Sequence, residues 1–597
     1  MLGVLRPVPL RHALPPDGDD ARGLPLLAAV PRSGEVTTTD VAPSAGSSVP
    51  EPPEARGLAS AVTTTDHKQI ALLTIGTALV MFAISGALAL LMRAQLAQPG
   101  QTIVSSHLYS ELFTMHGSGM IFLVITPIAV GMGVYLVPLQ VGAPAIAAPR
   151  AALLGYWLYL CGAVTMYSGF FTGGGAADAG WYSYLPLADR TYSPGPGQSL
   201  WIVGAFLSTS GMILLAGATL WTAMRHRAPG MTLLRMPVFT WAMVVTDLMT
   251  ISAFPSLLAA LSLMAAGQVN PAIFDHNVWN IAYQNLFWFY GHPVVYVMFF
   301  PFMGAVAETL AVFAGRRYVA YTWTVGSLLS FAALSMSVWG HHLFVSGQSA
   351  NDYYSLTTIA LTVPAGIEYF GFLSTIAFGR LVYRTPMLFA LAFIPQFLIG
   401  GLTGVMLGTP VIDYHVNGTY FVVAHFHYTL FAGSVFGMFA GLYLWWPKAT
   451  GFMLGEGLGK MHFWLMVLGT NLTFLPMFAV GYLGMPRRVA TYPSSPVIND
   501  LNLLESIGAG ILAVAMIVFA VNVVRSTRRR TPAGPDPWGG HTLEWATTSP
   551  PPRFNFLAIP PIHGFAPLFD LRQRVDAGKE SPGSPSEEVS QPGPGPA

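Results

Sequence analysis

Charged side chains are scarce in this sequence. Only 9% of its 597 residues are Asp, Glu, Lys or Arg, whereas 53% are hydrophobic. Soluble globular domains carry roughly 25% charged residues. The composition therefore excludes an ordinary water-soluble protein and indicates an integral membrane protein.

Cysteine is nearly absent, and neither sign of charge is in excess. The single cysteine, Cys161, excludes a disulfide framework and a cysteine-ligated zinc or iron–sulfur site. The formal net charge of +1 gives no basis for nucleic-acid binding. Any metal centre must therefore use histidine or carboxylate ligands.

Long hydrophobic runs are abundant. Twelve runs approach the ~20 residues that cross a bilayer, and each should be a helix because lipid offers the backbone no hydrogen-bond partners. We therefore expect an all-α integral membrane protein with twelve transmembrane helices over residues 61–527. Basic residues gather in alternate connections, such as "MRHRAPGMTLLR" and "GRRY", and again in "RSTRRR" after the last run. This pattern predicts a multi-pass protein of the cell membrane with both termini in the cytoplasm.

The two ends of the chain have a different composition. Residues 1–60 are rich in Pro, Ala, Gly and Ser, which predicts a disordered cytoplasmic tail. Residues 528–597 predict a cytoplasmic extension, in which "DPWGGHTLEWATTSPPPRFNF" lies against the membrane domain and the last twenty residues are disordered.

Six histidines fall inside the hydrophobic runs. An ionisable residue in a membrane is costly to hold there without a partner or a task. For one isolated histidine, a hydrogen bond between helices is an equally good explanation, but six together favour metal or cofactor binding. They are His116, His292, His341, His342, His425 and His427.

His425 and His427 occur in "VVAHFHY". Residues two apart on an α-helix point about 200° away from each other, so these two side chains should serve two different centres. His116, from another helix, could complete one centre as a bis-histidine haem for electron transfer, while the other centre would keep an open face.

His292, His341 and His342 could bind one metal ion from two helices. Three imidazoles with an open position suit copper or iron better than magnesium or calcium. Tyr296 follows His292 by four residues and should lie on the same helix face.

With these motifs the chain resembles subunit I of the haem-copper oxygen reductases, the cytochrome c oxidase superfamily. The resemblance covers about residues 62–560 and rests on "TTTDHK", "MHG", "GHPxVY", "WxHH", "VVAHFHY" and "GMPRR"; the C-terminal segment looks most like actinobacterial members. It implies two haems, which we expect to be of the A type although types B and O stay open, and one copper ion.

The resemblance also implies a role for each histidine. His116 and His427 would ligate the low-spin haem iron and His425 the high-spin haem iron. The copper would be held opposite the high-spin iron by His292, His341 and His342.

Other residues match family positions as well. Tyr296 matches a tyrosine joined covalently to the copper ligand one turn before it, which supplies an electron and a proton for O–O cleavage. Arg487 and Arg488 match a pair that binds haem propionates, and Asp413 matches a propionate partner. Arg93 matches the residue that meets the formyl group of the low-spin haem in haem A enzymes.

The first proton route of the family is altered here. Val294 replaces the glutamate of "GHPEVY", and Ala145 replaces an aspartate at the route's entrance. One subgroup instead places tyrosine and serine before the histidine, but this chain has Tyr290 followed by Gly291. We therefore expect reduced or absent proton pumping.

The second proton route also departs from the family. Ala365 and Glu368 replace the threonine and the lysine of the usual motif. A buried carboxyl can still carry protons, so we interpret Glu368 as a catalytic proton carrier. Asp247, in the middle of its hydrophobic run, is either a further relay or a hydrogen-bonded structural residue.

The outer ion sites are changed too. Asn417 and Gly418 replace a His-Asp pair, which puts a bound magnesium in doubt, and Gln95 stands where a calcium or sodium ligand often occurs.

The favoured function is the catalytic subunit of a respiratory terminal oxidase that reduces O2 to water. A nitric oxide reductase of the same superfamily is the alternative, because loss of both proton routes favours it, although the intact Tyr296 opposes it. A non-catalytic membrane transporter or haem protein is a third possibility that retention of all six histidines argues against.

The implied partners follow from the resemblance. They are an oxidase subunit II with a dinuclear copper centre, subunit III, and cytochrome c as electron donor. The quinol-oxidase signature before the first haem ligand is absent, because Leu108 and Glu111 stand there, and this favours cytochrome c over quinol.

Overall fold

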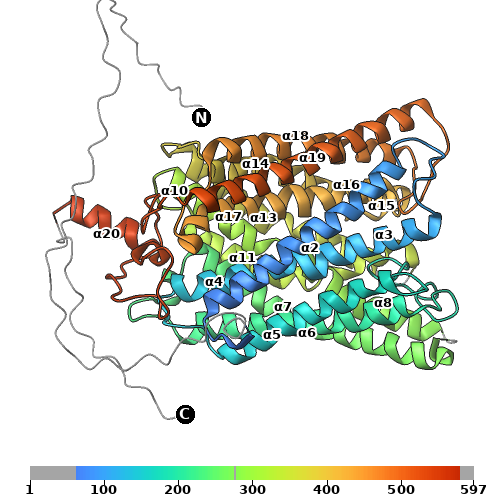
Figure 1. Ribbon diagram of the computed structural model, residues 1–597, viewed down its shortest axis with the longest axis horizontal. Coiled ribbons are helices and arrows are strands. Elements are labelled where there is room, and N and C mark those ends of the chain that lie inside the picture. Colours follow the sequence, from blue (N-terminus) through green and yellow to red (C-terminus); the bar gives the residue numbers. More distant parts are fainter. Residues whose placement is uncertain (1–61, 275–276, 348, 579–597) are drawn as a thin grey trace, which may run out of the picture. The chain divides into compact units, whose positions relative to one another are not determined.

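Long helices account for nearly all regular structure in the computed structural model, which describes residues 62–578 except 275, 276 and 348. In this part of the chain, twelve helices are long and apolar enough to cross a membrane. They run side by side along a common direction (Figure 1). The predicted all-α fold with twelve spans is confirmed. The prediction for residues 1–60 lies outside the described residues.

Several spans are built from more than one helical segment. In chain order the elements are α2 (His67–Gln95); α3 (Ser106–Ser118), η1 (Gly119–Ile125) and α4 (Thr126–Gln140); α5 (Pro149–Ser168); α6 (Pro196–Arg225); α7 (Val238–Val269); α8 (Asn277–Gly291), α9 (Pro293–Val297) and α10 (Phe300–Phe313); α11 (Tyr321–Ser335) and η5 (Trp339–Ser346); α12 (Asn351–Ala360) and α13 (Thr362–Ala377); α14 (Thr385–Leu407); α15 (Pro410–Val416); α16 (Tyr420–Thr429), η6 (Leu430–Val435) and α17 (Phe436–Thr450); α18 (Glu456–Tyr482); α19 (Pro496–Arg529); and α20 (Pro567–Asp576).

Local sequence signals set where the helices begin. The Asp66 carboxylate accepts a hydrogen bond from the Lys68 amide at 3.0 Å at the start of α2. Ser105 caps α3 in the same way. Proline occupies the first turn of α5, α6, α14 and α19, where its missing N–H costs nothing.

Helices α5 and α6 approach closely through glycine. A Cβ on Gly162 would lie 2.6 Å from the Gly204 carbonyl oxygen, and one on Gly155 would lie 2.8 Å from the Gly211 oxygen. Small residues at helix contacts are the usual way for membrane helices to pack, because lipid provides no hydrophobic force between them.

Two spans contain wider π-helical turns, which the sequence did not predict. Segment η1 begins three residues after His116, and segment η6 begins three residues after His427. Such turns inside α-helices occur often at functional sites. The segment with His341 and His342 also differs from the expected α-helix, because it is the 3₁₀ segment η5.

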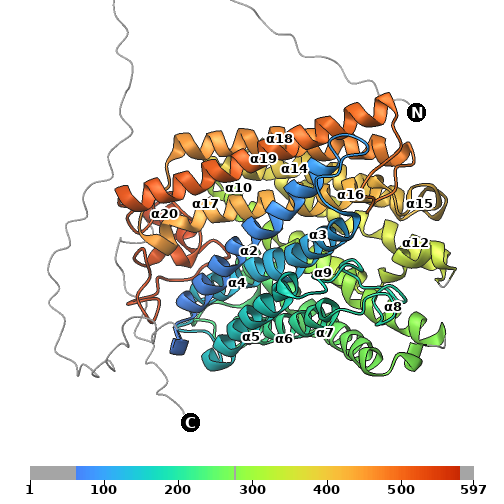
Figure 2. The ribbon, with the colours of Figure 1, turned by 45° about the vertical axis from the view of Figure 1, so that its right-hand side comes forward.

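The C-terminal extension packs on one end of the helix bundle. Glu544 accepts hydrogen bonds from Gln140 at the end of α4 and from Trp445 in α17. Asp570, in α20, forms an ion pair with Arg317, in the basic connection after α10. The extension therefore lies at the end that carries this basic connection, opposite α12 and α15 (Figure 2).

Candidate haem-copper site

A cavity of about 1440 Å³ lies among the spans, and all six predicted histidines line it. Pockets for single small molecules usually measure about 300–1,000 Å³. The cavity therefore has room for more than one bound group. Arg93, Tyr296, Asp413, Arg487 and Arg488 also line it.

His116 and His427 face each other across part of this cavity. Their ring centroids are 6.4 Å apart and their planes differ by 13°. The Nδ1 atom of His116 donates to the Ser85 carbonyl at 2.9 Å, and that of His427 donates to the Val423 carbonyl at 2.8 Å. Each Nε2 is therefore left with a free lone pair. If one metal ion lay between the two rings, a metal–nitrogen bond of about 2 Å to each ring, plus the distance from each nitrogen to its ring centroid, would give a similar centroid separation.

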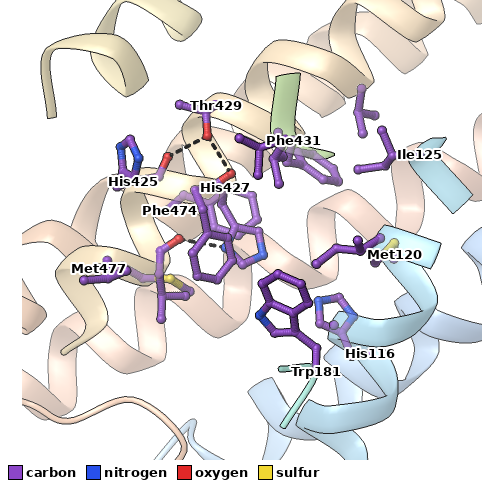
Figure 3. A pocket seen from close by; sticks show the side chains of 18 of the residues that line it. His116, Met120, Ile125, Trp181, His425, His427, Thr429, Phe431, Phe474 and Met477 are labelled. Carbon is purple, nitrogen blue, oxygen red and sulfur yellow. Dashed lines mark hydrogen bonds between the residues drawn. The ribbon is translucent and has the colours of Figure 1, made fainter. Parts of the chain in front are cut away.

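His425 lies against a different helix. Its Nδ1 is 3.0 Å from the Gly400 carbonyl oxygen and 3.1 Å from Thr403 Oγ1, both on α14. His427 instead stacks on Phe474 of α18, with ring centroids 4.3 Å apart. Figure 3 shows His425 on one side and His427 with His116 on the other. The rings of His425 and His427, two residues apart on α16, therefore line different parts of the cavity.

Three imidazoles converge at the junction of α8 and α9 with η5. The ligand atoms of His292, His341 and His342 all lie within 4.8 Å of one another. His292 Nδ1 is 3.3 Å from His342 Nε2, which is 3.2 Å from His341 Nε2. Three nitrogens placed this way can hold one metal ion.

Neighbouring side chains fix the orientation of this trio. The Nδ1 atom of His341 lies 2.8 Å from Thr358 Oγ1 on α12. The ring of His342 stacks on Trp288, with centroids 3.7 Å apart. No sequence motif marks Trp288, although its position four residues before His292 places it on the same helix face.

Tyr296 lies beside His292. The two ring centroids are 4.7 Å apart with an interplanar angle of 57°. The Nε2 atom of His292 is buried and has no hydrogen-bond partner. Tyr296 thus lies against one member of the histidine trio and lines the cavity.

Two adjacent guanidinium groups border the cavity near Tyr182. Arg488 lies over the Tyr182 ring at 4.1 Å and Arg487 at 5.9 Å. Burial lowers the pKa of Arg488. Its backbone is left-handed, with φ of 67°, and a Cβ at Gly180 would come within 2.9 Å of its guanidinium. Among the described residues neither arginine forms an ion pair with a carboxylate, which leaves both able to bind an anion.

Asp413 and the altered positions Asn417 and Gln95 are held by hydrogen bonds within the protein. Burial raises the pKa of Asp413 to about 6, and its Oδ2 accepts a hydrogen bond from Asn417 at 3.0 Å. The Gln95 amide binds the backbone of Gln101, Val104 and Ala490. Gln95 therefore joins outer loops.

Arg93 reaches the cavity from α2. Its Nη2 donates to the Asn502 carbonyl at 2.7 Å and approaches Ser506 Oγ at 3.1 Å. Its Nη1 lies 2.9 Å from Glu505 Oε2. The Nε atom is buried without a hydrogen-bond partner, as expected if an acceptor on a bound group completes the site. Glu505 lies in the last span, where no sequence motif marked it as a site residue.

Glu368 lies outside the cavity lining but close to it. Ala365, one turn earlier on α13, lines the cavity, and the Glu368 carboxyl is 2% exposed with no hydrogen bond to either oxygen. Among the described residues, the buried hydroxyl groups of Tyr318 and Thr324 also make no hydrogen bond of normal length, although the two side chains lie near each other. A Cβ on Gly371, one turn after Glu368, would lie 2.3 Å from the Tyr318 hydroxyl, so this phenol points at the same stretch of α13.

The positions of the altered proton route inside the spans are buried, whereas Ala145 at its entrance is partly exposed. Val294 is fully buried, and Tyr290 stacks parallel to Phe122 with centroids 6.1 Å apart. Asp247 is fully buried in α7, and neither carboxylate oxygen has a hydrogen-bond partner. The hydrogen-bonded structural explanation for Asp247 thus has no contact to support it.

Comparison with known proteins identifies the family. The family described as "Cytochrome C and Quinol oxidase polypeptide I" matches residues 69–511. The chain is 45% identical over 523 residues to the "Probable cytochrome c oxidase subunit 1-beta" of Nocardia farcinica, covering 87% of this chain and 89% of that protein. It is 43% identical over 545 residues to the cytochrome c oxidase subunit 1 of Corynebacterium efficiens, covering 89% and 94%.

The fold is also that of a solved oxidase. A heme-copper terminal oxidase dimer aligns with a TM-score of 0.63 and 17% identity, covering 77% of this chain and 84% of that one. With a cavity lined by six histidines inside twelve spans, and relatives this similar over most of its length, the chain belongs to the cytochrome c and quinol oxidase polypeptide I family, whose members use haem and copper.

Proposed function

We propose that this chain is the catalytic subunit of a respiratory terminal oxidase, a haem-copper cytochrome c oxidase that reduces O2 to water. The observation that carries this proposal is the trio of imidazole nitrogens within 4.8 Å of one another with Tyr296 beside them. The cytochrome c oxidase names of the similar proteins favour this function over nitric oxide reduction.

The histidines divide into three sets by their contacts. His116 and His427, with parallel rings, would bind the low-spin haem iron, and His425, held by α14, would bind the high-spin haem iron. The trio His292, His341 and His342 would bind copper. When bound, these metals supply O2 binding and the electrons for its reduction.

The remaining cavity residues position the haems. The guanidinium groups of Arg487 and Arg488, which pair with no carboxylate among the described residues, suit carboxylates such as haem propionates, and Asp413, with its raised pKa, can share a proton there. The unpartnered Nε of Arg93 suits an oxygen acceptor such as the formyl group of haem A. Two A-type haems are therefore the proposed complement.

Tyr296 holds a proton at the edge of the copper site. Its hydroxyl faces the cavity from a ring packed against His292, so it can deliver that proton to the reacting oxygen. The absence of any hydrogen bond on His292 Nε2 is compatible with a covalent link between these two residues.

Protons must reach Tyr296 through the protein, and Glu368 is the proposed carrier. Glu368 and Thr324 both lie close to Tyr318, and in the described part of the chain none of the three side chains makes a hydrogen bond of normal length. Leaving one buried polar group unpaired costs about 1–3 kcal/mol, so such a cluster is a place for ordered water. Because Val294 and Ala145 cannot carry protons, we propose that pumping is reduced or absent.

The assembly follows from the family. Oxidase subunit II with a dinuclear copper centre would pass electrons from cytochrome c to this chain, and subunit III completes the proposed complex. We place residues 528–597 in the cytoplasm because their described part packs against the end that carries Arg316 and Arg317. The placement of residues 1–60, before the membrane domain 61–527, in the cytoplasm rests on the distribution of basic residues alone.

Metal content and spectra test the proposal. Purified complex should hold two haems and one copper in this subunit, bind carbon monoxide at one haem, and consume O2 with reduced cytochrome c. Non-haem iron in place of copper, with turnover of nitric oxide and not of O2, would overturn it.

A further inference from the structure

A buried ion pair lies at the wall of the cavity that His116 and His427 also line. Arg93 Nη1 lies 2.9 Å from Glu505 Oε2, and the two side chains are 9% and 0% exposed. Glu505 is in α19 and Arg93 in α2, so the pair also joins the last span to the first.

The location of Arg93 relates it to the proposed low-spin haem. Its helix α2 supplies the Ser85 carbonyl that orients His116, and eight residues along an α-helix correspond to about 12 Å. Arg93 and both histidines line one cavity. The charge on this guanidinium therefore acts on that haem through protein and not through water.

Glu505 is the one carboxylate that forms an ion pair with Arg93 in the described part of the chain. In the part of the chain that the structure describes, the other ionisable groups that interact with Arg93 are the phenols of Tyr109, Tyr420 and Tyr492, which are neutral at physiological pH. Asn502 and Ser506, which also contact Arg93, carry no charge. The net charge of this group of side chains thus depends on Glu505.

We infer that Glu505 is the counter-ion that neutralises Arg93 and thereby lowers the reduction potential of the low-spin haem. An unbalanced guanidinium would favour the added electron, and the carboxylate cancels that attraction. Interactions between charges are strong where water does not screen them. The inference rests on the proposed binding of a low-spin haem by His116 and His427.

The test is a redox titration of the six-coordinate low-spin haem band in the purified oxidase complex. Glu505→Gln keeps the size of the side chain and removes its charge. We expect its equilibrium constant for haem reduction to rise on the order of tenfold, which is about 59 mV for one electron. Glu456→Gln, the same change at an ion pair with Lys460 in α18, is the matched control and should leave the potential unchanged.

A second variant changes the charge in the opposite direction. Glu505→Gln buries an unpaired cation and could prevent assembly, whereas Asn502→Asp adds a carboxylate to a side chain that already contacts Arg93 at 3.2 Å. We expect Asn502→Asp to lower the equilibrium constant several-fold. An unchanged potential in either assembled variant, or a rise in Asn502→Asp, would overturn the inference. Absence of the low-spin band from the native protein would instead refute the proposed haem site.

Discussion

Replacing Glu368 should slow turnover without disturbing either haem. The substitution Glu368→Gln keeps the shape of the side chain but cannot release and regain a proton. Glu368 is 2% exposed, and among the described residues neither of its oxygens makes a hydrogen bond, so a glutamine of the same shape keeps the packing and breaks no hydrogen bond. The haem spectra should therefore stay as in the native enzyme.

The expected magnitude follows from the surroundings of Glu368. Without it, a proton that passes from Tyr318 toward the cavity at Ala365 loses its proposed carboxyl carrier. Moving an uncompensated charge through a protein interior costs several kcal/mol, and each 1.4 kcal/mol on a barrier slows a rate tenfold. We thus expect Glu368→Gln and Glu368→Ala to lower O2 consumption at least about tenfold if proton delivery limits turnover.

The assay is O2 consumption with reduced cytochrome c, together with external acidification, in reconstituted vesicles. Asp247→Asn is the matched control, because Asp247 is also a buried carboxyl without a hydrogen bond. Undiminished turnover in Glu368→Gln would remove this residue from the proton route, and a selective loss in Asp247→Asn would place the route along α7. Acidification near one proton per electron in the native enzyme would refute reduced pumping.

Three further predictions follow from the site and the C-terminal extension. His427→Ala should abolish the low-spin haem band and spare carbon monoxide binding, whereas His425→Ala should do the reverse; loss of the same band in both would refute the separation of the two rings. Tyr296→Phe should retain both haems and the copper by spectra and elemental analysis, yet lose at least about 10²-fold in turnover; native turnover would contradict its role. Burial lowers the pKa of His541 to about 3, below the 6.5 of the unfolded chain, so the unfolded chain binds more protons below pH 6.5 and the fold loses stability as pH falls. At pH 5.5 the loss in free energy of unfolding is about 1.4 kcal/mol. Proteolysis of the extension should therefore speed up at acid pH in the native protein, and less so in His541→Gln. An equal increase in both proteins would exclude His541 as the source.

The sequence alone determined the class of the protein and its chemistry. Scarce charge and twelve apolar runs require helices across a bilayer, because a helix pairs the backbone N–H and C=O groups of each run within that run and lipid offers them no other partners. The spacing of His425 and His427 separates their rings because an α-helix turns about 100° per residue. These conclusions depend on one helix at a time, where spacing fixes direction.

Only the tertiary structure decided which helices meet. His292 and the pair His341 and His342 converge because η5 folds back against the junction of α8 and α9, and no spacing along the chain specifies that contact. Arg93 and Glu505 belong to the first and last spans, so the sequence shows two separate charges where the fold makes one neutral pair. Such pairs depend on packing between distant helices, which the periodicity of either helix alone does not encode.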